Sequence, residues 1–228
     1  MLTEYHCHIL PGIDDGAQNV ETSLKMVEAM YEQGVRRIIA TPHFYCHREE
    51  SVGQFLEKRS AAFGALMSQG PKISDIRLGA EIAIEHGVSE TPGLDRLAIE
   101  GTDLILLEFP YRGFEEWMEE ELDNVAAKYG FEIVIAHVHR YLDFYSKEQT
   151  ENLVNINAIL QINNEAFENR KERKLVKRLM DEGYPLVFGS DAHNMEKRRP
   201  NWDLLRKKAD EDAIAASDAV LDGHLLRR

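Results

Sequence analysis

Residues 103–136 read DLILLEFPYRGFEEWMEEELDNVAAKYGFEIVIA, and this stretch decides the fold class. The apolar runs Asp103–Phe109 and Phe131–Ala136 each have the length of a buried strand. Between them, Phe114–Tyr129 has the pattern of a helix and is followed by Gly130, a residue that commonly ends helices. Two buried strands joined by a helix indicate a parallel β-α-β unit, because parallel strands need a long crossover.

The same alternation continues in both directions along the chain. Further strands are predicted at Leu2–His6, Val35–Ala40, Ile76–Ile82, Ala158–Ile162 and Tyr184–Gly189, and further helices at Val20–Gln33, Ser51–Ser68, Gln149–Asn155, Glu165–Glu182 and Trp202–Asp210. About seven strands separated by helices favour an α/β barrel or a distorted barrel. A doubly wound open sheet is the alternative, although no glycine-rich dinucleotide fingerprint follows any strand. The tail Ala213–Arg228 has no clear pattern.

Length and composition are those of an ordinary soluble protein. The 228 residues fit one domain spanning 1–228, with two domains as the weaker alternative. No apolar run approaches the roughly 20 residues of a membrane span, and the N-terminus lacks a signal-peptide pattern. We therefore expect a cytoplasmic protein that is not embedded in a membrane. The oligomeric state is left open.

The net charge of -13 argues against nucleic acid as a partner, because a phosphate backbone requires a basic surface. Bound divalent cations would offset this charge locally, so a phosphorylated substrate remains compatible with an acidic chain.

Potential metal ligands follow almost every predicted strand. Six apolar strands end in His, Asp or Glu: the residues are His6, His8, His43, Glu81, Glu108, His137, His139, Asp191 and His193. The carboxyl ends of barrel strands converge on one face, where such folds hold their active sites. A single His after a strand is more often a hydrogen-bonded loop residue, but six such strand ends together predict a metal centre.

The spacing supports this interpretation. His6 and His8 lie two residues apart on an extended segment and therefore point to the same side, as do Asp191 and His193. Glu108 lies within an apolar strand, where a carboxylate is costly unless it is paired or binds a cation. Imidazole with carboxylate suits zinc, manganese or iron, and a carboxylate such as Glu81 can bridge two ions.

Several nearby residues have more than one interpretation. Asp14 and Asp15 fit a tight turn before Gly16 as well as they fit a further ligand. Arg140 follows His137 and suits phosphate clamping, whereas most of the run 197–199 would be expected to be solvated surface. Neither cysteine begins a Cys-x5-Arg motif, so a cysteinyl-phosphate route is not indicated, and Cys7 should face away from its His neighbours.

These residues carry a family resemblance. HCHILPGIDDG at 6–16 resembles the opening motif of the polymerase-and-histidinol-phosphatase (PHP) superfamily, and more narrowly that of the manganese-dependent tyrosine phosphatases from bacterial capsule and exopolysaccharide gene clusters. Later segments are similar to further motifs of that group, in the same order up to about residue 200: IATPH at 39–43, GAEI at 79–82, LEF at 107–109, IAHVHR at 135–140 and SDAHN at 190–194.

The resemblance implies a distorted (β/α)7 barrel of the PHP type that binds three divalent ions, manganese first, with iron or zinc as alternatives. Its implied ligand sets are His6, His8, Glu81 and Asp191 for one ion, Glu81, Glu108 and His137 for a second, and Asp15, His43 and His193 for a third. Arg140 and Arg198 match the phosphate-binding arginines, although Arg199 is adjacent. Asp191 and His193 are the candidates for protonating the leaving group.

The implied activity is hydrolysis of phosphotyrosine without a covalent enzyme intermediate, on a protein such as a bacterial tyrosine kinase. The alternatives are a small-molecule phosphatase such as histidinol-phosphate phosphatase, a non-catalytic metal-binding regulatory module, and an exonuclease domain that the acidic charge disfavours. His139, the stretch Phe44–His47 and the tail after residue 210 depart from the family pattern.

Overall fold

Strands and helices alternate through the residues that the computed structural model describes, 1–48 and 51–226. The strands are β1 (Leu2–Cys7), β2 (Val35–Ala40), β3 (His43–Phe44), β4 (Asp75–Leu78), β5 (Glu81–Ala83), β6 (Leu104–Glu108), β7 (Glu132–Ile135), β8 (Ile159–Asn163) and β9 (Leu186–Gly189). The α-helices are α1 (Val20–Glu32), α2 (Val52–Met67), α3 (Glu116–Tyr129), α4 (Lys147–Val154), α5 (Arg170–Asp181), α6 (Trp202–Lys208) and α7 (Glu211–Gly223). Short 3₁₀ helices lie at Val88–Glu90, Leu94–Leu97, Val138–Asp143 and Asn164–Phe167.

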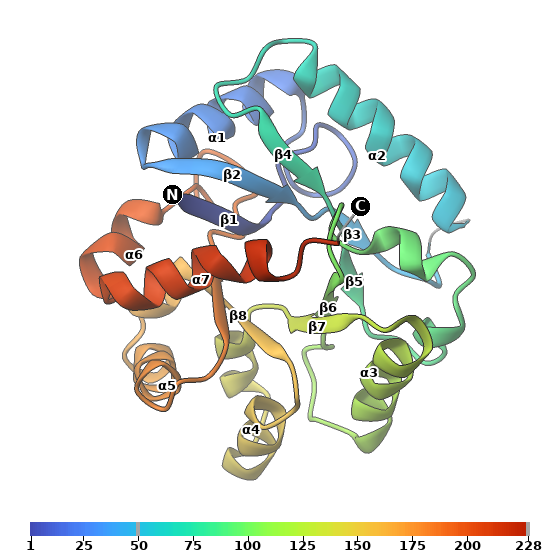
Figure 1. Ribbon diagram of the computed structural model, residues 1–228, viewed down its shortest axis with the longest axis vertical. Helices are drawn as coiled ribbons and strands as arrows, with labels where there is room; N and C mark the ends of the chain where they lie inside the picture. Colours follow the sequence, from blue (N-terminus) through green and yellow to red (C-terminus); the bar gives the residue numbers. More distant parts are fainter. Residues whose placement is uncertain (49–50, 227–228) are drawn as a thin grey trace.

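All strand pairs in these sheets are parallel, in the orders β1-β2-β4 and β3-β5-β6-β7-β8-β9. Because β2 leads into β3 and β4 into β5, the two sheets form successive parts of one ring, with helices outside it (Figure 1). A single bridge between Cys7 and Ala192 joins β1 to the chain after β9. The predicted α/β fold of the distorted-barrel type is confirmed, with this seam narrower than a full strand ladder.

The predicted strand Ile76–Ile82 is wrong as one unit, since it is divided into β4 and β5 at Gly79–Ala80. The partner segment is interrupted at the same level by Thr41–Pro42, and proline has no backbone N–H to donate. Single hydrogen bonds span the gap, from Gly79 N to the Ala40 carbonyl and from Glu81 N to the Pro42 carbonyl. The break brings His43 level with Glu81, its register partner.

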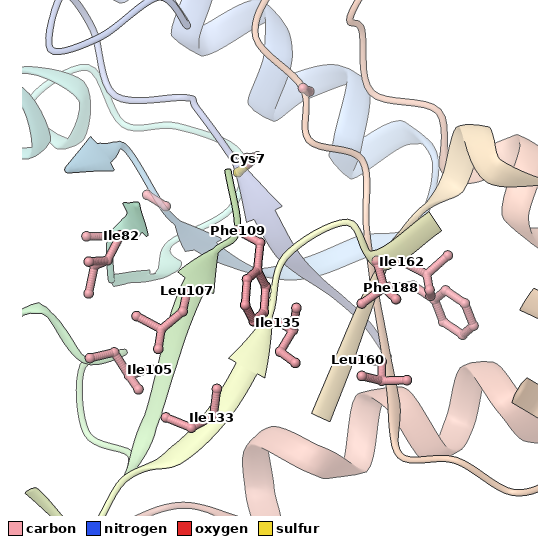
Figure 2. Packing of buried hydrophobic residues seen from close by; sticks show 14 of the residues in the cluster. Cys7, Ile82, Ile105, Leu107, Phe109, Ile133, Ile135, Leu160, Ile162 and Phe188 are labelled. Carbon is pink, nitrogen blue, oxygen red and sulfur yellow. The ribbon is translucent and has the colours of Figure 1, made fainter. Parts of the chain in front are cut away.

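Alternate residues of the strands face two different apolar layers. The outer layer packs against the helices and includes Ile105, Leu107, Ile133, Ile135, Leu160, Ile162 and Phe188, which Figure 2 shows on neighbouring strands. The inner layer includes Tyr5, Ile39, Leu106, Val134, Ile159 and Val187 and is completed by Leu221 of α7. The inner apolar layer fills one end of the space inside the ring. The polar residues at the carboxyl ends of the strands therefore lie at the other end.

One predicted helix begins at the wrong residue, and one helix lies where the sequence has no clear pattern. Asn169 caps α5 by accepting from the N–H groups of Lys171 and Glu172, so the helix begins at Arg170 rather than at Glu165. The tail without a clear pattern contains most of α7, which lies across the ring in Figure 1. The last two residues of this tail, 227 and 228, are outside the described range. The other predicted boundaries agree or differ by one or two residues. None of the helices in the described ranges is long and apolar enough to cross a membrane.

Candidate metal centre

The structure brings all nine predicted ligands to the carboxyl ends of the strands. Around His6 and His8, the two Nε2 atoms are 3.2 Å apart, and Glu81 Oε2 lies 3.1 Å from the first and 3.2 Å from the second. Asp191 Oδ1 completes this group at 3.6 Å from His6 Nε2 and 3.3 Å from His8 Nε2. Four potential donor atoms therefore converge on one point.

A second convergence involves His43, His193 and Asp15. Asp15 Oδ1 lies 3.4 Å from His43 Nε2 and 3.3 Å from His193 Nε2. Asp14 instead accepts a hydrogen bond from His8 Nδ1 at 2.7 Å and from the backbone N–H groups of Gly16 and His43. The two neighbouring aspartates thus have different roles: Asp15 faces the centre, and Asp14 orients His8.

A third group shares the other oxygen of Glu81. His137 Nε2 lies 2.8 Å from Glu81 Oε1 and 3.4 Å from Glu108 Oε1. Glu81 also lies 3.0 Å from His43 Nδ1 through Oε2, so its carboxylate touches all three groups. This is the placement that a bridging carboxylate requires.

Backbone strain marks two of these positions. His137 (φ 30°) and Asp191 (φ 49°) are the non-glycine residues of the described chain with positive φ, a conformation that costs roughly 1–3 kcal/mol in such residues. Each lies two residues after the end of a strand, β7 or β9, at the point where the chain must turn while its side chain faces the centre. Strain concentrated at functional geometry is typical of sites that the surrounding fold holds in place.

The donor set fits bound cations because several buried atoms have no hydrogen-bond partner. These atoms are Glu81 Oε2, Asp191 Oδ1, His43 Nδ1 and His193 Nε2, and each faces the shared centre. Leaving a buried polar atom without a partner costs about 1–3 kcal/mol, and more when it is charged. Bound divalent ions would use the free lone pairs of these carboxylate oxygens and, once protons are displaced, those of the imidazole nitrogens, and imidazole with carboxylate suits manganese, iron or zinc.

Electrostatics in the centre keep its carboxylates ionised. Burial alone would raise the pKa of Glu81, but the surrounding His6, His137 and His43 outweigh it and hold that pKa well below its usual range. Burial opposes protonation of His43 and His137, yet their carboxylate partners raise the pKa of His43 to about 10 and that of His137 to about 9. Protons therefore occupy these imidazoles where cations are absent, and a metal must displace them.

Two arginines border the centre through a single carboxylate oxygen. Arg140 Nη1 and Arg198 Nη2 each donate to Asp191 Oδ2 at 2.6 Å, and Arg140 Nη2 donates to Glu165 at 2.6 Å. Arg199 makes no such contact. The Nε–H of Arg198 is buried without a partner, so it remains available to an anion. The contacts with Asp191 thus separate Arg198 from its neighbour.

Sequence patterns missed three residues that hold the centre from behind. Gln161 Oε1 lies 3.0 Å from His6 Nδ1 and accepts from the His137 N–H, while Asn163 donates to Asp191 Oδ2 at 3.0 Å. Both residues lie on β8, and polar residues at alternate positions of that strand were the available signal. The third is Glu4, which lies under His6 and accepts its backbone N–H.

Other residues singled out from the sequence lie outside these groups. Cys7 packs in the outer apolar layer, as its spacing predicts. His139 is buried with both ring nitrogens unpartnered, 3.8 Å from Glu165. Cys46, His47 and Glu85 form a further cluster at the rim. There, burial and Glu85 raise the pKa of the Cys46 thiol to about 12, which makes it a poor ligand at neutral pH.

Comparison with known proteins gives one consistent group. Residues 2–217 match the family described as capsular polysaccharide synthesis, CpsB/CapC. The tyrosine-protein phosphatase YwqE of Bacillus subtilis is 30% identical over 86% of this chain and 79% of its own length. The tyrosine-protein phosphatase CpsB of Streptococcus agalactiae is 25% identical over 99% of this chain and all of its own.

A solved structure extends the likeness to the fold. It comes from work on YwqE from Bacillus subtilis and CpsB from Streptococcus pneumoniae, described as unique metal-dependent tyrosine phosphatases. It matches with a TM-score of 0.78 and 26% identity, covering 100% of this chain and 97% of the other. The expected resemblance is thus confirmed, and this chain belongs to the CpsB/CapC family of capsular polysaccharide synthesis proteins.

Proposed function

We propose that this protein is a metal-dependent protein tyrosine phosphatase, a phosphoric monoester hydrolase. The observation that carries the proposal is the convergence of five histidines and three further carboxylates around Glu81, with buried donor atoms unpartnered. The names of the matched relatives support the substrate class, and the family description supports a setting in capsule or exopolysaccharide synthesis. A bacterial tyrosine kinase as substrate and a cytoplasmic location are part of this proposal.

The proposal includes three divalent ions, manganese first, with iron or zinc as alternatives. The residues that would hold them are His6, His8, Glu81 and Asp191 for the first, Glu81, Glu108 and His137 for the second, and Asp15, His43 and His193 for the third. When bound, such ions supply an activated water and positive charge for phosphoryl oxygens. Asp14, Gln161 and Asn163 would orient the ligands through the hydrogen bonds described above.

The proposed task of Arg140 and Arg198 is to bind the phosphoryl oxygens. Guanidinium carries five donors, so each arginine can keep its bond to Asp191 and still offer others to phosphate. Positive charge fixed beside the transferring group offsets the charge that spreads over its equatorial oxygens. The Nε–H of Arg198, which has no partner in the protein, is one donor that we assign to this role.

The leaving group needs little help from a side-chain acid. Burial alone would raise the pKa of Asp191, but His6, His8 and Arg140 hold it well below its usual range, so this residue stays ionised. Burial lowers the pKa of His193, whose Nδ1 is already bonded to the Asp191 carbonyl. A tyrosine hydroxyl has a pKa near 10, low for an alcohol, so its oxygen can depart as the anion.

The test compares metal content and phosphotyrosine-peptide hydrolysis in wild type and His6→Ala. We expect the variant to lose bound metal and at least about 100-fold in kcat/KM, because it removes a ligand from the shared centre. His224→Ala is the matched control: this histidine also pairs with a carboxylate, Asp103 at 2.9 Å, but lies outside the centre. Equal rates in wild type and His6→Ala would remove the proposed centre from the chemistry.

A further inference from the structure

Positive charge is concentrated in one part of this acidic chain. Residues 170–208 hold 12 of the 27 Lys and Arg residues but only six of the 40 Asp and Glu residues. The segment includes α5, α6 and the loop after β9, and Figure 1 shows the two helices on the same side of the ring. Since Arg198 belongs to it, the basic segment reaches the centre itself.

A cavity of about 730 Å³ connects the two regions. It shares Arg140, Asp191 and Arg198 with the centre and extends past Lys197 and Arg199 to Lys207 of α6. A space of this volume exceeds what a phosphate group requires, and ligand cavities of several hundred Å³ are typical of sites that hold larger groups. The cavity therefore offers room for parts of a substrate on either side of the phosphorylated residue.

The charges in this cavity are not all neutralised by the protein. Glu165 pairs with Arg140, and Asp203 pairs with Lys207 at 3.3 Å. Among the described residues, Lys197 and Arg199 have no ion pair, and both are exposed. Glu168 is the opposing unpaired carboxylate in the lining. Three consecutive cations at 197–199 repel one another, so an anion is the ligand that this loop favours.

We propose that this cavity is a specificity subsite for acidic side chains next to the phosphotyrosine of the substrate protein. The inference rests on the proposed function and adds the sequence context of its substrate. A phosphopeptide with acidic neighbours would be repelled by a protein of charge -13 taken as a whole. The unpaired Lys197 and Arg199 reverse that repulsion locally and steer the peptide so that its phosphate arrives at Arg140 and Arg198.

The wild-type test uses two phosphotyrosine peptides of equal length, one flanked by Asp and Glu and the other by Ser. We expect kcat/KM for the acidic peptide to be several-fold higher, and the advantage to shrink as salt rises, because exposed charges are screened. Equal kcat/KM values for the two peptides would overturn the subsite while leaving the proposed function intact. Hydrolysis of neither peptide would overturn both.

The variant Lys197→Ala/Arg199→Ala then tests the two residues. Exposed charge pairs contribute only modestly to binding, so we expect the ratio of the two kcat/KM values to fall roughly fivefold, toward one. Lys72→Ala, which removes an exposed cation outside the basic segment, is the control and should keep the wild-type ratio. An unchanged ratio in the double variant would show that these cations do not bind the substrate.

Discussion

At the scale of single residues, the buried carboxylate of Glu4 supports the centre from behind. It accepts hydrogen bonds from His6 N (3.0 Å), Ser190 N (2.8 Å), Ser190 Oγ (2.6 Å) and Trp202 Nε1 (2.6 Å). A Cβ at Gly189 would meet Glu4 Oε1 and His6 at less than 3 Å, so only glycine fits there. Glu4 thus joins β1, the chain after β9 and α6 beneath the proposed ligands.

We expect Glu4→Gln to lower the free energy of unfolding by about 2–4 kcal/mol, because the amide replaces one of the two acceptor oxygens by an NH2 donor and leaves buried donors unpaired. Urea denaturation of the chelated protein measures this loss without a contribution from metal binding. Glu32→Gln, an exposed change at the end of α1, serves as the control and should stay within about 0.5 kcal/mol of wild type. A Glu4→Gln variant as stable as this control would show that the four bonds contribute little.

The sequence predicts the residues facing the centre but not those behind them. The local sequence pattern is enough to predict the residues at or just after the end of an apolar strand, which are His6, His43, His137 and Asp191. Two of the partners of Glu4, Ser190 and Trp202, lie 186 and 198 residues away along the chain, and no local pattern predicts a hydrogen bond at that separation. The choice of Asp15 over Asp14 likewise depends on where His43 and His193 meet.

At the scale of elements, α7 shows how a weakly patterned segment can be structural. The hydroxyl of Tyr5 donates to the Ser217 carbonyl and accepts from Leu221 N, and Ser217 Oγ accepts from Phe188 N. These bonds tie the helix to β1 and β9. Its buried face is small, consisting of Ser217 and Leu221, which is why apolar periodicity did not reveal it.

Leu221→Ala tests whether α7 completes the inner layer. The side chain is fully buried among Tyr5, Leu104 and Leu106, so we expect a loss of about 2–4 kcal/mol in the free energy of unfolding. The proposed ligands lie at the opposite end of the strands, so KM for a phosphotyrosine peptide should stay within about twofold, since ΔΔG values of distant sites add nearly independently. Val220→Ala, a partly buried neighbour, should cost less. A shift in KM rather than stability would contradict this role.

The sequence mispredicted element boundaries where a helix cap or a strand break is set by a capping residue or by an adjacent segment of the chain. The apolar pattern of Ile76–Ile82 is continuous, and its division follows from Pro42 on the adjacent segment. Residues 164–167 form a 3₁₀ helix, and Asn169 then restarts the chain as α5. Neither feature changes the order of strands and helices, which is why the barrel class was predictable while its interruptions were not.

At the scale of the whole molecule, the ring has one narrow seam, and the proposed ligands lie on both sides of it. Across the seam His8 N donates to the Ala192 carbonyl at 2.9 Å, and Asp191 N donates to the His6 carbonyl at 2.7 Å. Elsewhere β6 and β7 are paired with neighbours on both sides. An ion held jointly by His6, His8 and Asp191 would therefore link the first strand of the ring to the last.

Removal of divalent ions is then expected to loosen the seam more than the rest of the ring. Chelation should lower the melting temperature, because an ion at 100 times its Kd stabilises the folded state by about 2.7 kcal/mol. Hydrogen exchange locates the effect: the amides of His8 and Asp191 should exchange faster after chelation, while those of β6 and β7 should keep their protection. Restoring manganese should reverse both changes. If all strands lost protection equally, the ions would stabilise the fold as a whole and not this junction; if none did, the proposed ligands would not hold ions tightly enough to matter for folding.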